Sequence, residues 1–513
     1  MKYLLVNPLR YQKDSYIFPP VHLLYIAQAI RRAGGEATIV DLPYLLDTDH
    51  KRFSLDDDSG IEYVLAQEFD VLGIGSVVSS YFYAERLVDA VRRRRPDTPI
   101  IVGGSLGQPL LDVWQSGEGP DFICEADGEL VMERFVRAFP HDIESVRAIP
   151  GLWARETDGS YTRTEAPELP MDLDYIPFVT YDEVEYEYFM ENQRKWVRNV
   201  LSQGNYHFDP NARFLPLIMS RGCVYDCTFC FHFNRLHRRH SPKYIADNVE
   251  FMMEKYGATA FNLLDDLTIV NKKWLHAVCD EFIARGINKK VAFFSGGGKP
   301  SVVDREILEH MLEAGFQRLS FGIESGSPSI LKVMNKGTTV EDNYSAIKMI
   351  KEVGMPYSVN IVFGMPGESK RTMNETRDFL ISLDLNSRDY YAALATPYPG
   401  SPLFRQVQEM GLVGGTRDYL HNLGGYADYR INMTDMSRAA FINHVLDVEF
   451  RVDVAYWAKR KRWGKVASLL LQKYAKMVYH GLVPPDVRGK LKLTSRFNAL
   501  LGRGQAAPAD THE

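Results

Sequence analysis

The chain has few cysteines and lacks the pattern of a disulfide-stapled protein. Only five cysteines occur in 513 residues, and no two of them show a spacing typical of a disulfide framework. We therefore expect a reducing compartment. Cys124 lies in a predicted strand and Cys279 in a predicted helix, so we expect each to be a small buried hydrophobic residue rather than a ligand.

Long apolar runs are also missing. No stretch of about twenty apolar residues is present to span a bilayer, and the apolar run that begins at Met1 is too short for a signal peptide. No nucleic-acid-binding patch, carrier-protein motif or peptide-binding signature stands out. We expect a cytoplasmic protein without a nucleic-acid partner.

The composition is that of an ordinary globular protein, with 45% apolar and 25% charged residues. The length suits about two or three domains with cores of their own. The formal net charge of -6 hides an asymmetry, because residues 451–496 contain twelve Lys and Arg against Asp453 and Asp486. That segment therefore carries +10 and the remainder -16, so the two ends are expected to meet different partners.

Three of the five cysteines are concentrated on one short stretch, Cys223, Cys227 and Cys230, with the spacing C-x3-C-x2-C. Three thiolates on one loop suit a metal centre, because a compact loop can direct them all at one ion or cluster. A structural zinc site needs a fourth ligand, for which His232 is the nearest candidate. An iron–sulfur cluster with three cysteine ligands would instead leave one iron open to a small molecule. Both alternatives are favoured over buried structural cysteines.

The loop has a context that resembles a known family. Phe229 precedes the last cysteine, and an apolar strand over residues 214–219 precedes the loop, as in the cluster loop of the radical S-adenosylmethionine (SAM) enzymes. The resemblance implies that Cys223, Cys227 and Cys230 hold a 4Fe-4S cluster whose fourth iron chelates SAM. Electron transfer from that cluster would cleave SAM to a 5'-deoxyadenosyl radical that abstracts hydrogen.

Residues 1–150 alternate between short apolar strands and amphipathic helices, which predicts a parallel, doubly wound sheet. Ligands of such sheets lie beyond the carboxyl ends of the strands. The predicted strands are 2–6, 37–41, 71–75, 100–102 and 121–125, and the predicted helices are 20–32, 61–67 and 81–95.

Glycine-rich turns follow these strands, and glycines let a backbone approach a large flat ligand closely. Glycines that merely form turns are the alternative. The succession of L-V-N-P, G-I-G-S, I-V-G-G and an acidic-Gly-Glu turn resembles the cobalamin-binding domain of cobalamin-dependent radical SAM enzymes. The sequence has no D-x-H-x-x-G, so bound cobalamin would lack a histidine from that motif. The resemblance implies cobalamin-binding roles for Asn7, Ser76, Val77, Gly103, Gly104, Ser105, Gly128 and Glu129.

Residues 151–212 are predicted to be a linker followed by an aromatic-rich segment between the domains. Proline punctuates the first part, and Tyr181, Tyr188, Phe189 and Trp196 lie in the second. Such a cluster either walls a substrate cavity or packs the two domains together, and packing is the favoured interpretation.

Residues 213–405 contain six strand-then-helix units, which predict a partial (β/α) barrel with its chemistry at the carboxyl ends of the strands. Predicted helices include 243–255, with Ser241 as its cap and Pro242 at its first position, and 305–314. The predicted strands are 214–219, 260–264, 291–294, 318–321, 358–363 and 390–395.

Carboxylates and glycines follow the barrel strands, where they suit the polar groups of a cofactor. By the resemblance, Asp265 or Asp266 would meet the amino group of SAM, and Glu324 and Ser325 its ribose or polar end. The segment from Asn360 to Gly364 would meet the adenine. Many relatives place an arginine after the third strand, where this chain has three glycines and Lys299. The glycines would widen the cavity, or Lys299 would supply the charge.

Two basic segments remain. His237 and His240 stand among arginines in a loop that we expect to be a solvated face, with contact to an acidic substrate or electron donor as the alternative.

Residues 406–501 are predicted to be a helical domain, with helices at 439–456 and 463–479, and residues 502–513 a disordered tail. Between the helices, Lys459 to Arg462 are flanked by tryptophans, as in helices that lie on anionic membranes. A solvated helical cap on the barrel is favoured.

The predicted fold is α/β: a Rossmann-like sheet of the cobalamin-binding type over 1–150, a radical SAM partial (β/α)6 barrel, and a helical C-terminal extension. The predicted activity is that of a radical SAM enzyme with a 4Fe-4S cluster, SAM and cobalamin that methylates an unactivated carbon of a small-molecule, lipid or natural-product substrate. A flavodoxin or ferredoxin would be the reductant. Cobalamin-dependent cyclisation, oxidation or rearrangement, as in tetrapyrrole cyclases, and a non-catalytic iron–sulfur or zinc module are the alternatives.

Overall fold

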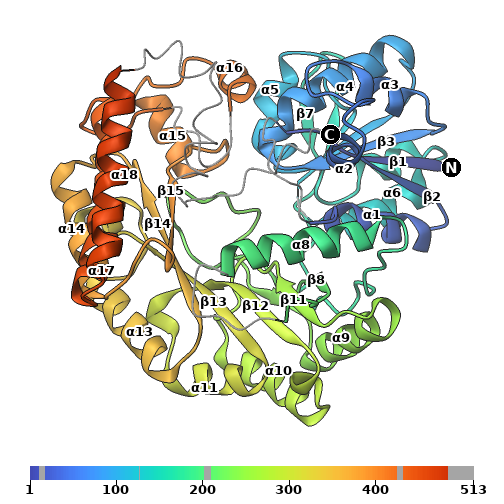
Figure 1. The fold of residues 1–513 in the computed structure, drawn as a ribbon. Coiled ribbons are helices and arrows are strands. Elements are labelled where there is room, and N and C mark those ends of the chain that lie inside the picture. Colours follow the sequence, from blue (N-terminus) through green and yellow to red (C-terminus); the bar gives the residue numbers. More distant parts are fainter. Residues whose placement is uncertain (11–17, 126, 202–208, 424–430, 483–513) are drawn as a thin grey trace.

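The computed structural model describes residues 1–10, 18–125, 127–201, 209–423 and 431–482, with the side chains of 198–201 and 474–482 left aside. Two sheets dominate it, and helices α1 (Val21–Arg32) and α8 (Tyr186–Leu201) lie between them (Figure 1). The predicted tail at 502–513, and Tyr206, His207 and Phe208 of the aromatic segment, lie outside the described residues.

The first sheet has seven strands in the order β2-β1-β3-β4-β5-β6-β7. Its first five strands are parallel, as predicted, and their order reverses direction between β1 and β3. The last two strands, which the sequence analysis missed, add an antiparallel edge beyond residue 150. The strands are β1 (Lys2–Asn7), β2 (Glu36–Asp41), β3 (Val71–Ser76), β4 (Ile100–Gly104), β5 (Phe122–Cys124), β6 (Leu152–Arg155) and β7 (Tyr161–Arg163).

Helices cover both faces of this sheet. Leu23 and Ala27 of α1 pack with Val131 and Phe135 of α6 on one face. Apolar residues of α3 and α4 pack on the other face. The remaining helices of this region are α2 (Leu42–Thr48), α3 (Ser59–Leu65), α4 (Tyr81–Arg94), α5 (Leu111–Gln115), α6 (Gly128–Ala138) and α7 (Ile143–Arg147).

The second sheet is the predicted six-stranded partial barrel, with all neighbours parallel in the order β15-β14-β13-β12-β11-β8. Its third strand is longer than predicted and includes all three glycines at 296–298. The strands are β8 (Phe214–Leu217), β11 (Ala260–Leu263), β12 (Ala292–Gly298), β13 (Phe316–Glu324), β14 (Tyr357–Phe363) and β15 (Tyr390–Leu394).

The barrel helices lie outside the strands and bury their apolar faces against them (Figure 1). Ser241 caps α9 by accepting a hydrogen bond from the amide of Tyr244, with Pro242 at the first position, as predicted. The helices are α9 (Pro242–Tyr256), α10 (Lys272–Ala284), α11 (Arg305–Glu313), α12 (Pro328–Val333), α13 (Val340–Val353), α14 (Lys370–Ser382) and α15 (Pro402–Glu409). Short 3-10 turns occupy Val78–Ser80, Gln108–Leu110, Ile287–Lys289 and Pro300–Val302.

Helix α8 joins the two parts and lies in the segment that the sequence analysis described as aromatic-rich without predicting a helix there. Tyr188 donates a hydrogen bond to Asp47, and the rings of Tyr44 and Tyr188 meet edge to face at 5.0 Å. Gln193, fully buried, accepts a hydrogen bond from the Asn262 side chain of β11. These aromatic residues therefore pack the domains together, as favoured.

Helix α1 also belongs to both cores. Leu23 packs under the first sheet, whereas Leu24 and Tyr25 belong to the core of the barrel. The N-terminus of α1 consequently lies at the junction of the two sheets.

The C-terminal region is helical, as predicted, with α16 (Thr416–His421), α17 (Arg438–Lys459) and α18 (Trp463–Leu482). Helix α17 packs along α14 on the outside of the barrel (Figure 1). Arg460 pairs with Asp384 at 2.9 Å, so part of the basic run faces the barrel, as the cap interpretation requires. No helix within the described ranges combines the length and apolarity needed to cross a membrane.

Candidate functional site

The cysteine loop begins at β9 (Ser220–Arg221), which pairs antiparallel with β10 (Arg238–Arg239). The loop between these strands closes tightly at Gly222. Its φ of +87° lies in the left-handed region, and a Cβ there would collide with the carbonyl oxygen of Leu236. Glycine is therefore required where the chain enters the loop.

The three thiols of this loop differ in burial. Cys227 is buried, and Cys223 and Cys230 are half-buried. Burial raises the pKa of all three, that of Cys230 to about 12. Within the described part of the chain, no three His, Cys, Asp or Glu side chains converge on the position of a single metal ion.

Two lysines supply positive charge beside these thiols. Lys336 Nζ lies 2.8 Å from Glu324 Oε1, with both side chains almost buried. Burial alone would lower the pKa of Lys336, but Glu324 and the nearby thiols raise it. Lys299 Nζ stands 3.9 Å from the ring centroid of Tyr225, and burial lowers its pKa. Both ammonium groups are placed to stabilise negative charge at the cysteine loop.

The segment that carries Lys336 also fixes the loop. The amide of Thr228 donates to the carbonyl of Met334 at 2.9 Å, and Asn335 Nδ2 donates to the carbonyl of Asp226 at 3.0 Å. The sequence analysis missed Lys336 because it lies after a short helix and not at a strand end.

Asp265 and Asp266 both hold the start of the cysteine loop. Asp265 accepts hydrogen bonds from the amide of Met219 and the hydroxyl of Ser220, each at 2.8 Å. Asp266 accepts one from the amide of Gly222, also at 2.8 Å. Burial raises the pKa of Asp265 to about 7. Since both oxygens of Asp265 are engaged, Asp266 is the better candidate of the two for SAM.

Glu324 and Ser325 end β13 in a strained turn. Glu324 has a φ of +65°, which is unfavourable for a side-chain-bearing residue, and the register with β14 shifts between Gly322 and Glu324. Ser325 is buried and lies 3.0 Å from the hydroxyl of Thr376. Glu324 therefore faces Lys336, while Ser325 fastens the turn to α14.

Asn360 lies within β14 and Gly364 directly after it, with a φ of +98° at the glycine. The Gly364 amide donates to Glu368, which is fully buried. Burial raises the pKa of Glu368 to about 8. The sequence analysis named this turn without assigning Glu368 a part in it.

The glycines at 296–298 do not all widen the cavity. A Cβ on Gly297 would lie 3.1 Å from the backbone of Leu267, and one on Gly298 would lie 2.6 Å from the Phe321 ring. Only Gly296 faces open space. Two of the three glycines therefore serve close packing, and Lys299 supports the alternative in which it supplies the charge.

Asn7 and Ser76 end β1 and β3 of the first sheet, where the strand order reverses. Asn7 Nδ2 donates to Asp41 at 2.8 Å, and Ser76 Oγ donates to Asn7 Oδ1 at 3.2 Å. Val77 follows, with 43% of its surface exposed, and Ser105 Oγ accepts a hydrogen bond from the amide of Val78 at 2.8 Å.

The two glycines that end β4 differ. A Cβ on Gly104, whose φ is +71°, would lie 2.7 Å from the carbonyl oxygen of Ser76, so this position requires glycine. A Cβ on Gly103 would meet only Cys124, at 3.8 Å. The edge thus combines neutral polar groups, open glycine and exposed Val77, which suits a large, largely apolar ligand.

Glu129 connects the first sheet directly to the cysteine loop. Its carboxylate pairs with Arg221 at 2.6 Å, two residues before Cys223. Arg221 and the fully buried Arg238 also pair with Asp127, at 3.3 and 2.6 Å. The loop expected to be a solvated face is therefore partly buried, because these acidic side chains of α6 and its cap draw its arginines inward.

Gly128 and Glu129 thus make contacts within the protein rather than presenting open groups to a ligand. A Cβ on Gly128 would lie 2.5 Å from Ile26 of α1, so this glycine allows α1 and α6 to approach. The carboxyl edges of the two sheets are held against each other through α6 and the cysteine loop.

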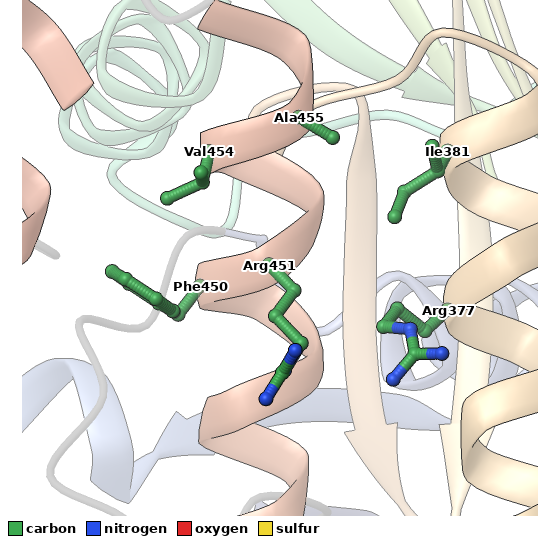
Figure 2. Close-up of a pocket in the computed structure, with 6 residues that line it drawn as sticks. All are labelled: Arg377, Ile381, Phe450, Arg451, Val454 and Ala455. Carbon is green, nitrogen blue, oxygen red and sulfur yellow. The ribbon is translucent and has the colours of Figure 1, made fainter. Parts of the chain in front are cut away.

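A separate groove of about 460 Å³ lies between α14 and α17 (Figure 2). Its walls are Arg377, Ile381, Phe450, Arg451, Val454 and Ala455, none of which is a predicted site residue. Arg451 is already paired with Asp447. The groove belongs to the packing of the C-terminal helix on the barrel.

Comparison with known proteins agrees with this geometry. The Radical SAM superfamily profile matches residues 217–380. The anaerobic magnesium-protoporphyrin IX monomethyl ester cyclase of Cereibacter sphaeroides is 25% identical over 80% of this chain and 64% of its own length. The chain thus spans under two thirds of that relative.

Two further similarities have different weight. The cytidylyl-2-hydroxyethylphosphonate methyltransferase of Streptomyces wedmorensis is 26% identical over 80% of this chain and 82% of its own. The solved structure of the radical SAM methyltransferase TsrM from Kitasatospora setae, with cobalamin and a [4Fe-4S] cluster bound, superimposes with a TM-score of 0.63. At 17% identity, covering 80% of this chain and 75% of TsrM, it establishes the fold.

The comparisons lead to a conclusion about part of the chain and about its fold: residues 217–380, which include the cysteine loop, match the Radical SAM superfamily model, and the chain has the two-sheet fold seen in the cobalamin-bound structure of TsrM.

Proposed function

We propose that this protein uses a 4Fe-4S cluster, SAM and cobalamin to methylate an unactivated carbon of a small-molecule or lipid-like substrate. The contact that carries the proposal is the ion pair of Glu129 with Arg221 at 2.6 Å. It holds the cysteine loop against the carboxyl edge of the first sheet, so reactants on the two edges would share one space.

The described residues fit the cluster. Cys223, Cys227 and Cys230 are its ligands in this proposal, and Lys299 and Lys336 offset the negative charge that three thiolates bring. Glu324 keeps Lys336 in place, and the strained backbone at Glu324 aims that carboxylate at the lysine.

The barrel edge would bind SAM through polar groups. Asp266 is proposed to face its amino group, Glu324 and Ser325 its ribose or polar end, and the turn from Asn360 to Gly364 its adenine. Gly296, which faces open space, leaves room beside them. Asp265 positions the loop and does not bind SAM directly.

The first sheet fits cobalamin. Asn7, Ser76, Val77, Gly103, Gly104 and Ser105 line its carboxyl edge, and Val77 and Gly103 leave an apolar surface and space for a macrocycle. When bound, the cluster would supply the electron that reduces SAM, and cobalamin would supply a transferable methyl group. The residues of the chain would position these groups relative to each other.

A second candidate is a cobalamin-dependent cyclisation or oxidation with the same cofactors. The similarity to an anaerobic tetrapyrrole cyclase over 80% of this chain favours it. The similarity to a methyltransferase over 82% of that protein's length favours methylation. A flavodoxin or ferredoxin is the proposed electron donor in either case.

Product analysis tests the proposal. The protein is reconstituted anaerobically with iron, sulfide and hydroxocobalamin and then given SAM and a reductant. We expect 5'-deoxyadenosine together with S-adenosylhomocysteine. Formation of 5'-deoxyadenosine alone would favour cyclisation or oxidation, and formation of neither would leave a non-catalytic iron–sulfur module.

A further inference from the structure

His22 is a histidine that the predicted cofactor sites do not use. It is the second residue of α1, at the junction of the two sheets. Its Nε2 lies 2.8 Å from the carbonyl oxygen of Gly75, the next-to-last residue of β3. The side chain therefore stands at the carboxyl edge of the first sheet, beside the point between β1 and β3 where the strand order reverses.

The hydrogen bond fixes the protonation pattern of the ring. A carbonyl oxygen only accepts, so Nε2 carries the proton and donates. Nδ1 then holds a lone pair, and no hydrogen bond to it occurs within the described residues. A metal-binding histidine is commonly oriented in this way, with one ring nitrogen held by a backbone carbonyl and the other left to the metal.

The surroundings keep this imidazole neutral. Burial by the surrounding protein lowers its pKa to about 4, and the charge of Arg10 lowers it further. The residue nevertheless keeps solvent-exposed surface, so a ligand can reach it. Asp41 of β2 is engaged by Asn7.

The ring of His22 packs closely on the end of β3. A Cβ on Gly75 would lie 3.4 Å from the imidazole and 2.9 Å from Leu23, so this glycine lets α1 approach the strand. Val77, two residues further along, is exposed. The edge beside His22 therefore offers one imidazole nitrogen next to an exposed apolar side chain.

We infer that His22 Nδ1 is the axial nitrogen ligand of cobalt on the face of the corrin ring that lies against the first sheet. This inference rests on the proposed binding of cobalamin. It assigns to α1 the ligand that the missing D-x-H-x-x-G motif would otherwise supply, with Gly75 as the group that orients the ring.

Electron paramagnetic resonance tests the ligand without any turnover. The probe is cobinamide, reduced to its Co(II) form, because it lacks the benzimidazole base and so brings no axial nitrogen of its own. We expect the bound complex to show three-line superhyperfine splitting from one 14N nucleus. Protein labelled with 15N-histidine should show two lines instead.

The decisive variant is His22→Ala. It should keep cobinamide bound, with affinity reduced by about tenfold, and lose the nitrogen splitting completely. His141→Ala is the matched control, because His141 is also exposed but precedes α7, away from the carboxyl edge. That control should leave the splitting unchanged.

Three outcomes would overturn the inference. Cobinamide bound to the unaltered protein without nitrogen splitting would remove His22 as a ligand while leaving the proposed function standing. Splitting that persists in His22→Ala would assign the ligand to another nitrogen. Failure of any corrinoid to bind would overturn both this inference and the cobalamin part of the proposed function.

Discussion

The carboxyl edges of the two sheets are linked through the ion pair of Glu129 with Arg221 but are built differently. The barrel edge carries buried charges that are paired with each other, as in Glu324 with Lys336, or with backbone amides, as in Asp265 with Met219. The edge of the first sheet carries Ser76 hydrogen-bonded to Asn7, which in turn donates to the single carboxylate of Asp41, together with Gly103 and the exposed Val77. Paired charges suit a charged cluster and SAM, whereas the second edge suits a large neutral ring.

The largest expected effect is a loss of bound iron that leaves corrinoid binding intact, which would distinguish the barrel edge from the edge of the first sheet. Cys227→Ala should abolish the broad iron–sulfur absorbance and reduce iron content to background, because two thiolates do not hold a cluster of this kind. Corrinoid binding should persist, because its proposed site lies on the other sheet. The control is Cys279→Ala, which removes a buried thiol of α10 outside the loop. A cluster that remains intact in Cys227→Ala would contradict the assignment of the cysteine loop as the cluster-binding site.

Loss of the Glu129–Arg221 ion pair should have the largest effect on the free energy of unfolding. Glu129→Ala leaves Arg221 partly unpaired in a buried setting, and loss of one partner from such a pair costs about 3–5 kcal/mol of unfolding free energy. Denaturant unfolding measures this loss. Arg134 pairs with Glu168 on the surface, so Arg134→Ala should cost about 1 kcal/mol or less. Equal losses in the two variants would mean that the Glu129 contact is an ordinary surface pair.

The barrel edge should also show a pH dependence of its own. Burial raises the folded-state pKa of Glu368 to about 8, above the value of about 4.3 for an unfolded glutamate. Between these values the folded state binds more protons, so stability falls as pH rises through this window. Glutamine cannot ionise, so Glu368→Gln should lack the decline of about a few kcal/mol in unfolding free energy that the unaltered protein shows as pH rises. Parallel stability profiles of Glu368→Gln and the unaltered protein from pH 5 to 8 would contradict this.

A smaller effect, on corrinoid affinity, is expected at the carboxyl edge of the first sheet. Val77→Asp should lower corrinoid affinity about tenfold, which corresponds to about 1.4 kcal/mol, with little change in stability because the side chain is exposed. Ile143→Asp is the control, since Ile143 has the same 43% exposure as Val77 but lies on α7. Corrinoid titration of both variants measures the difference. Equal affinities would remove Val77 from the site.

The smallest expected effect concerns the basic run before α18. Arg460 and Lys459 both pair with Asp384 in an exposed setting, so neutralising Lys459 to Arg462 should cost about 1 kcal/mol or less. Binding to anionic liposomes should not change. A loss of liposome binding in this variant would replace the cap interpretation with membrane contact.

The sequence predicted the parallel strands of both sheets and most of the strand ends, but not the antiparallel edge of β6 and β7 or the extension of β12 to Gly298. Hydrophobic periodicity and glycines mark those features locally, as in the strand before Cys223 and the turn after β14. Helix α8 was not predicted, and its contacts reach both parts of the molecule: Tyr188 donates to Asp47, and Gln193 accepts from Asn262 of the barrel strand β11.

The partners of charged residues were not predictable either. Glu129 was expected to face a cofactor and instead pairs with Arg221, 92 residues away in the chain. Lys336 reaches the cysteine loop from a helix end that carries no motif, and Asp265 gives both carboxylate oxygens to the loop entry. Such pairings depend on how the two sheets are placed against each other, which local sequence patterns do not encode.

The most direct test of two edges with separate cofactors is the iron and cobalt content of one set of anaerobically reconstituted proteins. The unaltered protein should contain about four iron atoms per chain and one cobalt. Cys227→Ala should lose the iron and keep the cobalt, and Val77→Asp, at a free corrinoid concentration below its weakened Kd, should contain less cobalt than the unaltered protein and keep the iron. Loss of both metals in either variant, or of neither in both, would contradict the assignment of one cofactor site to each sheet.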